Sequence, residues 1–248
     1  MKIIFNADDF GHSKGVNLGI IEAYKNGVVR STTMMAGMVG FDHAIALSRE
    51  NPGLHIGVHL TLTAGKSIGG IYKTITDEEG NFLKLLELES RAKAGELDLL
   101  EIEQEYEAQI QKIMAAGIEI DHFDSHHHTH NLKGIIDIFL KLAKKYDKKV
   151  RIYNKELLCG EYAAIKTTDC FDDSFYDEQA TLDHLKEIIS GKSGSIEIMC
   201  HPAYIDYDLY HTSGYNIKRI FELHVLTSPE LKSYLNENNM ELTSYYNL

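Results

Sequence analysis

Four histidines and a carboxylate lie close together in the stretch from Asp124 to His130. Neutral imidazole is available near pH 7 and binds divalent metals of intermediate softness, so this stretch predicts a bound cation. On an extended backbone, side-chain alternation would send His127 to one face and the other three histidines, with Asp124, to the opposite face. At most three of these side chains could then bind one ion. A metal-free interpretation, in which they are polar residues of a connecting loop, stays open at this point.

Other metal-binding groups recur where strands are expected to end. Asp8 and Asp9 follow a predicted strand from Lys2 to Ala7, His59 lies in one from Leu54 to Leu62, and His201 follows one from Ser195 to Cys200. The carboxyl ends of parallel barrel strands meet on one face, so residues far apart in the sequence can form one site there. Each group alone has a plainer interpretation, as a packed histidine or as acids that favour a helix N-terminus. Their recurrence favours a shared site.

The adjacent carboxylates Asp8 and Asp9 are suited to a division of labour. Neighbouring residues that leave a strand point in different directions, so one carboxylate can hold a cation while the other acts as a general base. A histidine on the opposite side, such as His201, could then protonate a leaving group.

Strand and helix patterns alternate along the chain, which favours a parallel sheet. Further strands are expected at 32–36, 118–123, 150–153 and 240–245, and helices at 13–27, from 41 to before 51, and at 99–116, 132–142, 182–189 and 229–235. Two loops, 64–81 and 154–176, separate these elements. We expect an α/β fold, a (β/α) barrel-like structure that is irregular or has fewer than eight strands.

Composition narrows the class of protein. A chain of 248 residues with 44% apolar residues fits one domain over 1–248. The formal charge of −12 argues against nucleic acid and anionic membranes as partners. Three scattered cysteines indicate a reducing compartment, and the short apolar run after Met1 is too brief for a signal sequence. No segment reaches membrane-spanning length. We therefore expect a cytoplasmic protein.

Several of these motifs together resemble those of the YdjC-like carbohydrate deacetylase family, which includes chitooligosaccharide deacetylases acting on N-acetylated sugars. The resemblance covers nearly the whole chain. Its carriers are Asn6–Gly11, Ser13–Gly15, Ser31–Thr33, Gly57–His59, Asp124–His130 and Met199–Ala203. Each fragment alone is weak, but the combination is specific.

The resemblance implies a fold similar to polysaccharide deacetylases, and a divalent cation held by Asp9, His59 and His126. By similarity, Asp8 would be the catalytic base and His201 the catalytic acid. The family allows Mg²⁺, while two imidazoles and one carboxylate suit Zn²⁺ or Mn²⁺ by ligand type. Four further residues become candidates to orient the ligands or to contact the substrate: Asp124, His128, His130 and Arg151.

The implied reaction is hydrolysis of the acetamide of an N-acetylated oligosaccharide, with release of acetate. One alternative is a metal-dependent phosphoesterase or amidohydrolase, although the first strand ends in Asp-Asp instead of His-x-His. Another is a non-catalytic sugar-binding protein, in which Tyr204, Tyr207 and Tyr210 stack on sugar rings. Those tyrosines have an equally simple interpretation as packing residues. A homodimer is also plausible.

Overall fold

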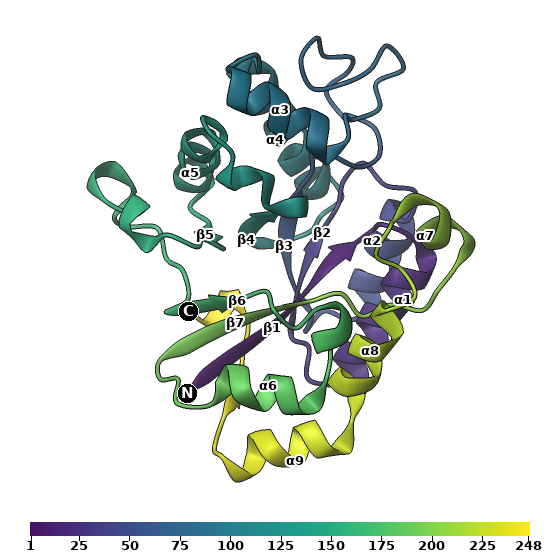
Figure 1. Ribbon diagram of the computed structural model, residues 1–248, viewed down its shortest axis with the longest axis vertical. Helices are drawn as coiled ribbons and strands as arrows, with labels where there is room; N and C mark the ends of the chain where they lie inside the picture. Colours follow the sequence, from purple (N-terminus) through teal and green to yellow (C-terminus); the bar gives the residue numbers. More distant parts are fainter.

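The computed structural model describes all 248 residues, and a parallel sheet curled into an incomplete barrel forms its centre (Figure 1). The strands are β1 (Lys2–Phe10), β2 (Ser31–Met34), β3 (His55–Leu60), β4 (Ile120–Ser125), β5 (Lys149–Val150), β6 (Cys170–Asp172), β7 (Ser195–Cys200) and β8 (Glu241–Leu242). They follow the order β5-β4-β3-β2-β1-β7-β6, and β8 pairs with the start of β1. Since β5 and β6 are the two edges of this order, the barrel stays open between them. The expectation of a barrel-like sheet is confirmed.

Nine α-helices accompany the sheet: α1 (Lys14–Lys25), α2 (Phe41–Glu50), α3 (Leu85–Ala94), α4 (Leu99–Ala115), α5 (Ile135–Tyr146), α6 (Leu182–Ile189), α7 (Tyr207–Thr212), α8 (Arg219–Thr227) and α9 (Pro229–Glu237). They form groups around the strands, with α1 packed against α2 and α8, and α4 packed against α5 (Figure 1). No helix combines the length and the apolar composition needed to cross a lipid bilayer.

Helix α1 illustrates how the sequence specifies these elements. Ser13 caps it, because its Oγ accepts a hydrogen bond from the Val16 backbone N–H at 3.2 Å. Val16 and Ile20 are fully buried on the face that packs inward, while Leu18 on the other side is exposed. The buried face is part of a continuous apolar cluster of 52 residues. Apolar periodicity and a capping hydroxyl therefore place the helix directly after the aspartates of β1.

Several boundaries differ from the sequence-based expectation. Strand β1 continues past Ala7 through both aspartates to Phe10, and β5 stops at Val150 instead of Tyr153. Helix α5 begins at Ile135, three residues later than expected, since Gly134 precedes it with a left-handed φ of 84°. Helices α3, α7 and α8 and strand β6 were not anticipated. The elements α7 and β6 are short, and only two residues of α3 are buried, so their apolar pattern is weak.

The histidine stretch is a turn and not an extended strand. Residues His126–Asn131 form a 3-10 helix after β4, and His127 and His128 have positive φ values of 55° and 52°. The Ser125 hydroxyl closes the turn by accepting a hydrogen bond from the His130 backbone N–H at 3.0 Å. The prediction that side chains alternate between two faces here is therefore wrong, because no strand geometry continues beyond Ser125.

Helix α1 lies directly against the segment that follows β7, and this contact leads to a stability prediction. A Cβ added to Gly19 would lie 2.4 Å from Ala203 Cα, so Gly19→Ala must push apart two elements of the site. We expect a loss of about 1–3 kcal/mol in the free energy of unfolding, larger than the gain of about 1 kcal/mol in helix propensity. Urea denaturation measures this loss. Gly214→Ala is the control, because a Cβ there would meet nothing within 4 Å. Equal stability of both variants would contradict the close contact.

Candidate metal centre

A cleft of about 750 Å³ opens where β1, β3, β4 and β7 end. Its lining includes all five residues that the sequence assigned to metal binding or catalysis, namely Asp8, Asp9, His59, His126 and His201. His128 also lines the cleft. Asp124, His130 and Arg151 do not line it and are fully buried. The carboxyl ends of the parallel strands thus bring together side chains from four distant parts of the chain.

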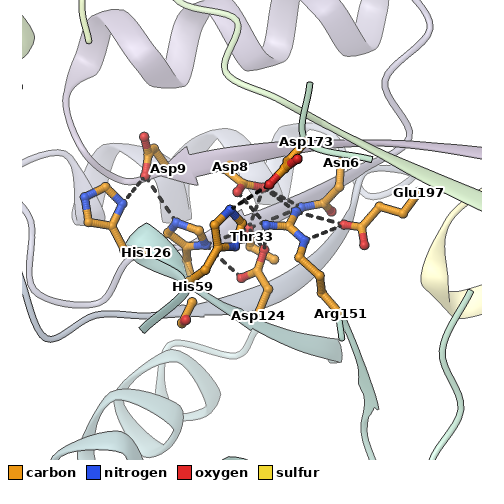
Figure 2. Close-up of polar contacts among 12 residues, drawn as sticks. Asn6, Asp8, Asp9, Thr33, His59, Asp124, His126, Arg151, Asp173 and Glu197 are labelled. Carbon is orange, nitrogen blue, oxygen red and sulfur yellow. Dashed lines mark hydrogen bonds and ion pairs between the residues drawn. The ribbon is translucent and has the colours of Figure 1, made fainter. Parts of the chain in front are cut away.

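The side chains of Asp8 and Asp9 point in different directions because the backbone near the end of β1 is irregular. Asp9 has a φ of 72°, in the left-handed region that only a few non-glycine residues adopt, and the register between β1 and β2 shifts between Ala7 and Phe10. Such a conformation costs about 1–3 kcal/mol and concentrates at functional sites. As a result, Asp8 points toward Arg151 while Asp9 points toward His59 and His126 (Figure 2).

Three ligand atoms converge on one point beside β1. Asp9 Oδ1 lies 3.3 Å from His59 Nε2 and 3.0 Å from His126 Nδ1, and the three atoms lie within 4.8 Å of one another (Figure 2). Asp9 Oδ1 is buried, and no hydrogen-bond donor is aligned with it. A buried carboxylate oxygen without a partner, facing two imidazole nitrogens, fits a divalent cation. These are the three residues that the sequence analysis assigned to the metal.

The imidazole of His59 is held by a carboxylate on the neighbouring strand. His59 and Asp124 are paired in the β3–β4 register, and Asp124 Oδ1 lies 2.7 Å from His59 Nδ1. This contact directs His59 Nε2 toward Asp9, the arrangement common among metal-binding histidines. Burial alone would lower the pKa of His59, but the carboxylates of Asp124 and Asp8 outweigh it and raise that pKa to about 10. A cation would therefore replace a proton on His59.

Asp8 is fixed by a fork of hydrogen bonds from Arg151. The Arg151 nitrogens Nη1 and Nη2 donate to Asp8 Oδ2 and Oδ1, both at 2.7 Å. Burial opposes the charge of Asp8, but Arg151 outweighs it and holds the pKa of that carboxyl well below its usual range. Asn6 Nδ2 also donates to Oδ1 at 2.9 Å, whereas Oδ2 has Arg151 as its only partner. Asp8 Oδ2 is therefore the oxygen with capacity to accept a further proton.

Arg151 links three carboxylates below the cleft (Figure 2). It is fully buried, with Nη1 at 3.0 Å from Asp124 Oδ2 and Nη2 at 2.8 Å from Glu197 Oε1. The Tyr245 hydroxyl donates to the other Glu197 oxygen at 2.5 Å. The sequence analysis included Arg151 and Asp124, but it missed Glu197. A glutamate between two isoleucines of a strand is expected to face solvent, whereas in a curled sheet this face is the barrel interior.

His201 follows β7 and is placed by groups from α8 and the loop before it. Its backbone N–H donates to Glu222 Oε2, and its Nδ1 lies 3.8 Å from Glu222 Oε1 and has no hydrogen-bond partner. The Tyr215 hydroxyl donates to the same Oε1 at 2.5 Å. The rings of Tyr176 and Tyr215 meet the imidazole edge-on, each with its centroid 5.7 Å away. His201 therefore packs against two tyrosine rings, and its Nδ1 lies near the Glu222 carboxylate.

The neighbours of His126 take separate places. His127 lines the cleft, with its ring centroid 3.9 Å from that of His126 and its Nδ1 at 2.9 Å from Thr63 Oγ1. The expectation that His127 faces away is therefore wrong, and the positive φ of the turn is the reason. Burial lowers the pKa of His127 to about 3, so it is neutral near pH 7. His128 also lines the cleft, with Nε2 at 3.9 Å from Asp173 Oδ2.

Arg219, Glu222, Tyr215 and His12 also line or support the site, and the sequence analysis did not assign them. One signal could have revealed two of them. Positions 219, 222, 223 and 226 share one face of a helix, and on it Arg219 and Glu222 stand beside Leu223 and Leu226. Charged residues on the apolar face of a helix are rarely buried without a specific partner. His12 is buried beside Thr212, and burial lowers the pKa of His12 to about 4.

Comparison with known proteins shows relatives over the full chain. The model of the family described as YdjC-like protein matches residues 2–237. Carbohydrate deacetylase 1 from Listeria innocua is 44% identical over 252 residues, covering 100% of both chains. A carbohydrate deacetylase from Clostridium beijerinckii is 39% identical over 250 residues and covers 99% of both.

Solved structures show the same fold. A crystal structure of an Enterococcus faecalis V583 protein assigned to cellobiose-phosphate cleavage has a TM-score of 0.89 and 35% identity, covering 99% of this chain and 98% of that one. The family 4 carbohydrate esterase from Streptomyces lividans, in complex with acetate, has a TM-score of 0.54 and 13% identity, covering 96% of this chain and 90% of that one. At 13% identity this second likeness concerns the fold alone.

The ligand geometry predicts which substitutions abolish metal binding. Replacing His59 or His126 by Ala removes one of three converging ligand atoms, so we expect purified protein to retain less than about a tenth of its bound metal. Elemental analysis after dialysis measures this. The control is His224→Ala on the exposed side of α8. Full metal content in both cleft variants would exclude these residues as ligands.

The buried His130 predicts a loss of stability in acid. Its ring is fully buried, stacks on Phe139 at 4.6 Å and has its Nδ1 at 2.6 Å from Ser125 Oγ. Burial lowers the pKa of His130 from its usual value of 6.5 to about 3. The unfolded chain therefore binds more protons between these values, and stability falls as pH falls through 6.5.

Between pH 7 and pH 5 this one group should contribute about 2 kcal/mol to the loss of unfolding free energy. His130→Gln removes the titrating group, so its urea-unfolding free energy should fall less steeply over the same pH range. Parallel pH profiles for the two proteins would show that His130 does not carry this dependence.

Proposed function

Since the chain belongs to the YdjC-like protein family, we propose that it is a metal-dependent carbohydrate deacetylase. The reaction is hydrolysis of the acetamide of an N-acetylated amino sugar, with acetate as one product and an amino sugar as the other. The observation that carries the proposal is the cleft itself. In it, Asp9, His59 and His126 converge on one point while Asp8, held in a separate ion pair, stays free of that point.

The reaction needs a strong electrophile and an activated water, because amide resonance makes the carbonyl unreactive. A divalent cation at Asp9, His59 and His126 would supply Lewis-acid polarisation of the carbonyl and of the attacking water. Asp8 accepts the proton of the water through Oδ2, the oxygen whose only partner is Arg151. Its lowered pKa keeps the carboxylate ionised at physiological pH, the form that can accept a proton.

His201 is the group suited to protonate the departing amine. It lies at the end of β7, whose residue Cys200 pairs with Ala7 of β1, so it stands beside the strand that carries the base. Its Nδ1 lies 3.8 Å from Glu222 Oε1, so a carboxylate stands beside the imidazole. Asp8 and His201 thus take a proton at one side of the acetamide and return one at the other.

The substrate is proposed to be an oligosaccharide. A second hollow of about 810 Å³ adjoins the catalytic cleft and shares four lining residues with it: Thr63, Ala64, Lys84 and Thr212. Together the two hollows exceed the space that one sugar ring requires. Two imidazoles in the ligand set favour Zn²⁺ or Mn²⁺, and Mg²⁺ is the alternative that the resemblance allows.

The remaining assignments are proposals of the same kind. Residues 1–248 would act as one catalytic domain, in the cytoplasm, with a homodimer as one possible assembly and neither nucleic acid nor membrane as a partner. All three cysteines are free, in keeping with a reducing compartment. The non-catalytic sugar-binding alternative has less support, because Tyr204, Tyr207 and Tyr210 do not line the catalytic cleft.

Acetate release from N-acetylated mono-, di- and tetrasaccharides, with added divalent ions, tests the proposal. We expect Asp8→Asn to keep its bound metal and to lose at least about 100-fold in kcat, because the amide cannot accept the proton. His201→Gln should also keep the metal and lose activity. Tyr207→Phe, on the exposed side of α7, is the control. Full activity in Asp8→Asn would exclude it as the base, and no acetate from any sugar would exclude the reaction.

A further inference from the structure

The metal-facing carboxylate of Asp9 is held from behind by Arg219, the first residue of α8. Arg219 Nη2 donates to Asp9 Oδ2 at 2.7 Å, and Arg219 Nε donates to the Tyr215 carbonyl oxygen at 2.8 Å. The side chain is 2% exposed, and its guanidinium lies 5.5 Å from the centre of the Tyr215 ring. The Arg219 side chain is therefore held by Tyr215, in the segment before α8, as well as by Asp9.

We propose that Arg219 is a positioning residue that holds Asp9 with Oδ1 turned toward the metal-binding point. The inference builds on the proposed metal-dependent function and goes beyond it, since it assigns a role to Arg219, which lines the cleft and acts through Asp9. Arg219 occupies Oδ2 and leaves Oδ1 turned toward His59 and His126.

The two oxygens of Asp9 have opposite surroundings, which supports this role. Oδ2 accepts a charge-assisted hydrogen bond, whereas the buried Oδ1 has no aligned donor. A carboxylate free to rotate can bind a divalent cation with both oxygens. At Asp9 the left-handed backbone fixes one end of the side chain and Arg219 fixes the other. Rotation into a two-oxygen mode would break the Arg219 contact.

The positive charge of Arg219 and its positioning role predict opposite changes in metal affinity when Arg219 is removed. A guanidinium beside a metal ligand repels the incoming cation, so charge alone predicts that metal binds more tightly once Arg219 is removed. Positioning predicts weaker binding, since replacing a residue that orients a metal ligand typically lowers metal affinity by 10- to 100-fold. The two effects therefore cannot be confused in a measurement of affinity.

The experiment measures the Zn²⁺ dissociation constant of the full chain by competition with a chromophoric chelator. For Arg219→Ala we expect binding to weaken by about 10- to 100-fold. Guanidinium at millimolar concentration should restore part of the affinity, because it can occupy the space of the lost side chain. Urea, which is similar in shape but neutral, should not. Arg30→Ala is the matched control, since Arg30 donates to three backbone carbonyls and does not line the cleft.

Equal or tighter Zn²⁺ binding by folded Arg219→Ala would overturn the inference, and so would a loss that guanidinium and urea change equally. If Arg219→Ala does not fold, Arg219→Lys decides. It keeps the charge but not the planar guanidinium that donates to both Asp9 and the Tyr215 carbonyl. Weaker Zn²⁺ binding therefore supports positioning, and unchanged or tighter binding overturns it. Acetate release separates this inference from the proposed function. A chain that binds Zn²⁺ in this pattern but releases no acetate would refute the function and leave the role of Arg219 intact.

Discussion

The buried guanidinium of Arg151 is the interaction on which the interior of this barrel depends. Three carboxylates, those of Asp8, Asp124 and Glu197, lie around it and are almost entirely removed from water. An isolated buried carboxylate would take up a proton, because its charge is too costly in such a place. With Arg151 among them, Asp8 stays ionised. His59 and Arg151 together keep Asp124 ionised, and Asp124 orients His59. One cation therefore supports both the proposed base, Asp8, and, through Asp124, the proposed metal ligand His59.

The buried cluster of Arg151 and its carboxylates has a cost in stability. Replacing a buried ionic cluster with apolar side chains of similar volume often leaves stability unchanged or improves it, so such clusters are weak evidence for stability. Here the charged side chains lie where the strands end and catalysis is proposed. Three residues of the same region, Asp9, His127 and His128, have positive φ values. Burial of the apolar cluster of 52 residues stabilises the fold and offsets the free-energy cost of this strained and charged region.

The sequence was sufficient for residues whose position follows from strand ends. Asp9, His59 and His126 could be assigned because each stands beside the carboxyl end of a regular strand and matches a family motif. The direction of His127 could not, since it depends on positive φ values that nothing in a run of histidines indicates. Arg219 could not be assigned either. Its place beside Leu223 and Leu226 on one helix face signals burial, but its partner Asp9 follows only from the long-range packing of α8 against α1.

The order of strands has a consequence for how this molecule forms. The strand that carries both aspartates, β1, pairs on one side with β2 and on the other with β7, so residue Lys2 lies opposite Ser195. Contacts between segments so distant in sequence are slow to form, because closing a long loop costs entropy before any pairing is gained. His201 and Arg219 can join Asp8 and Asp9 only once β7 has paired with β1. The candidate site is therefore complete only after these distant segments have come together.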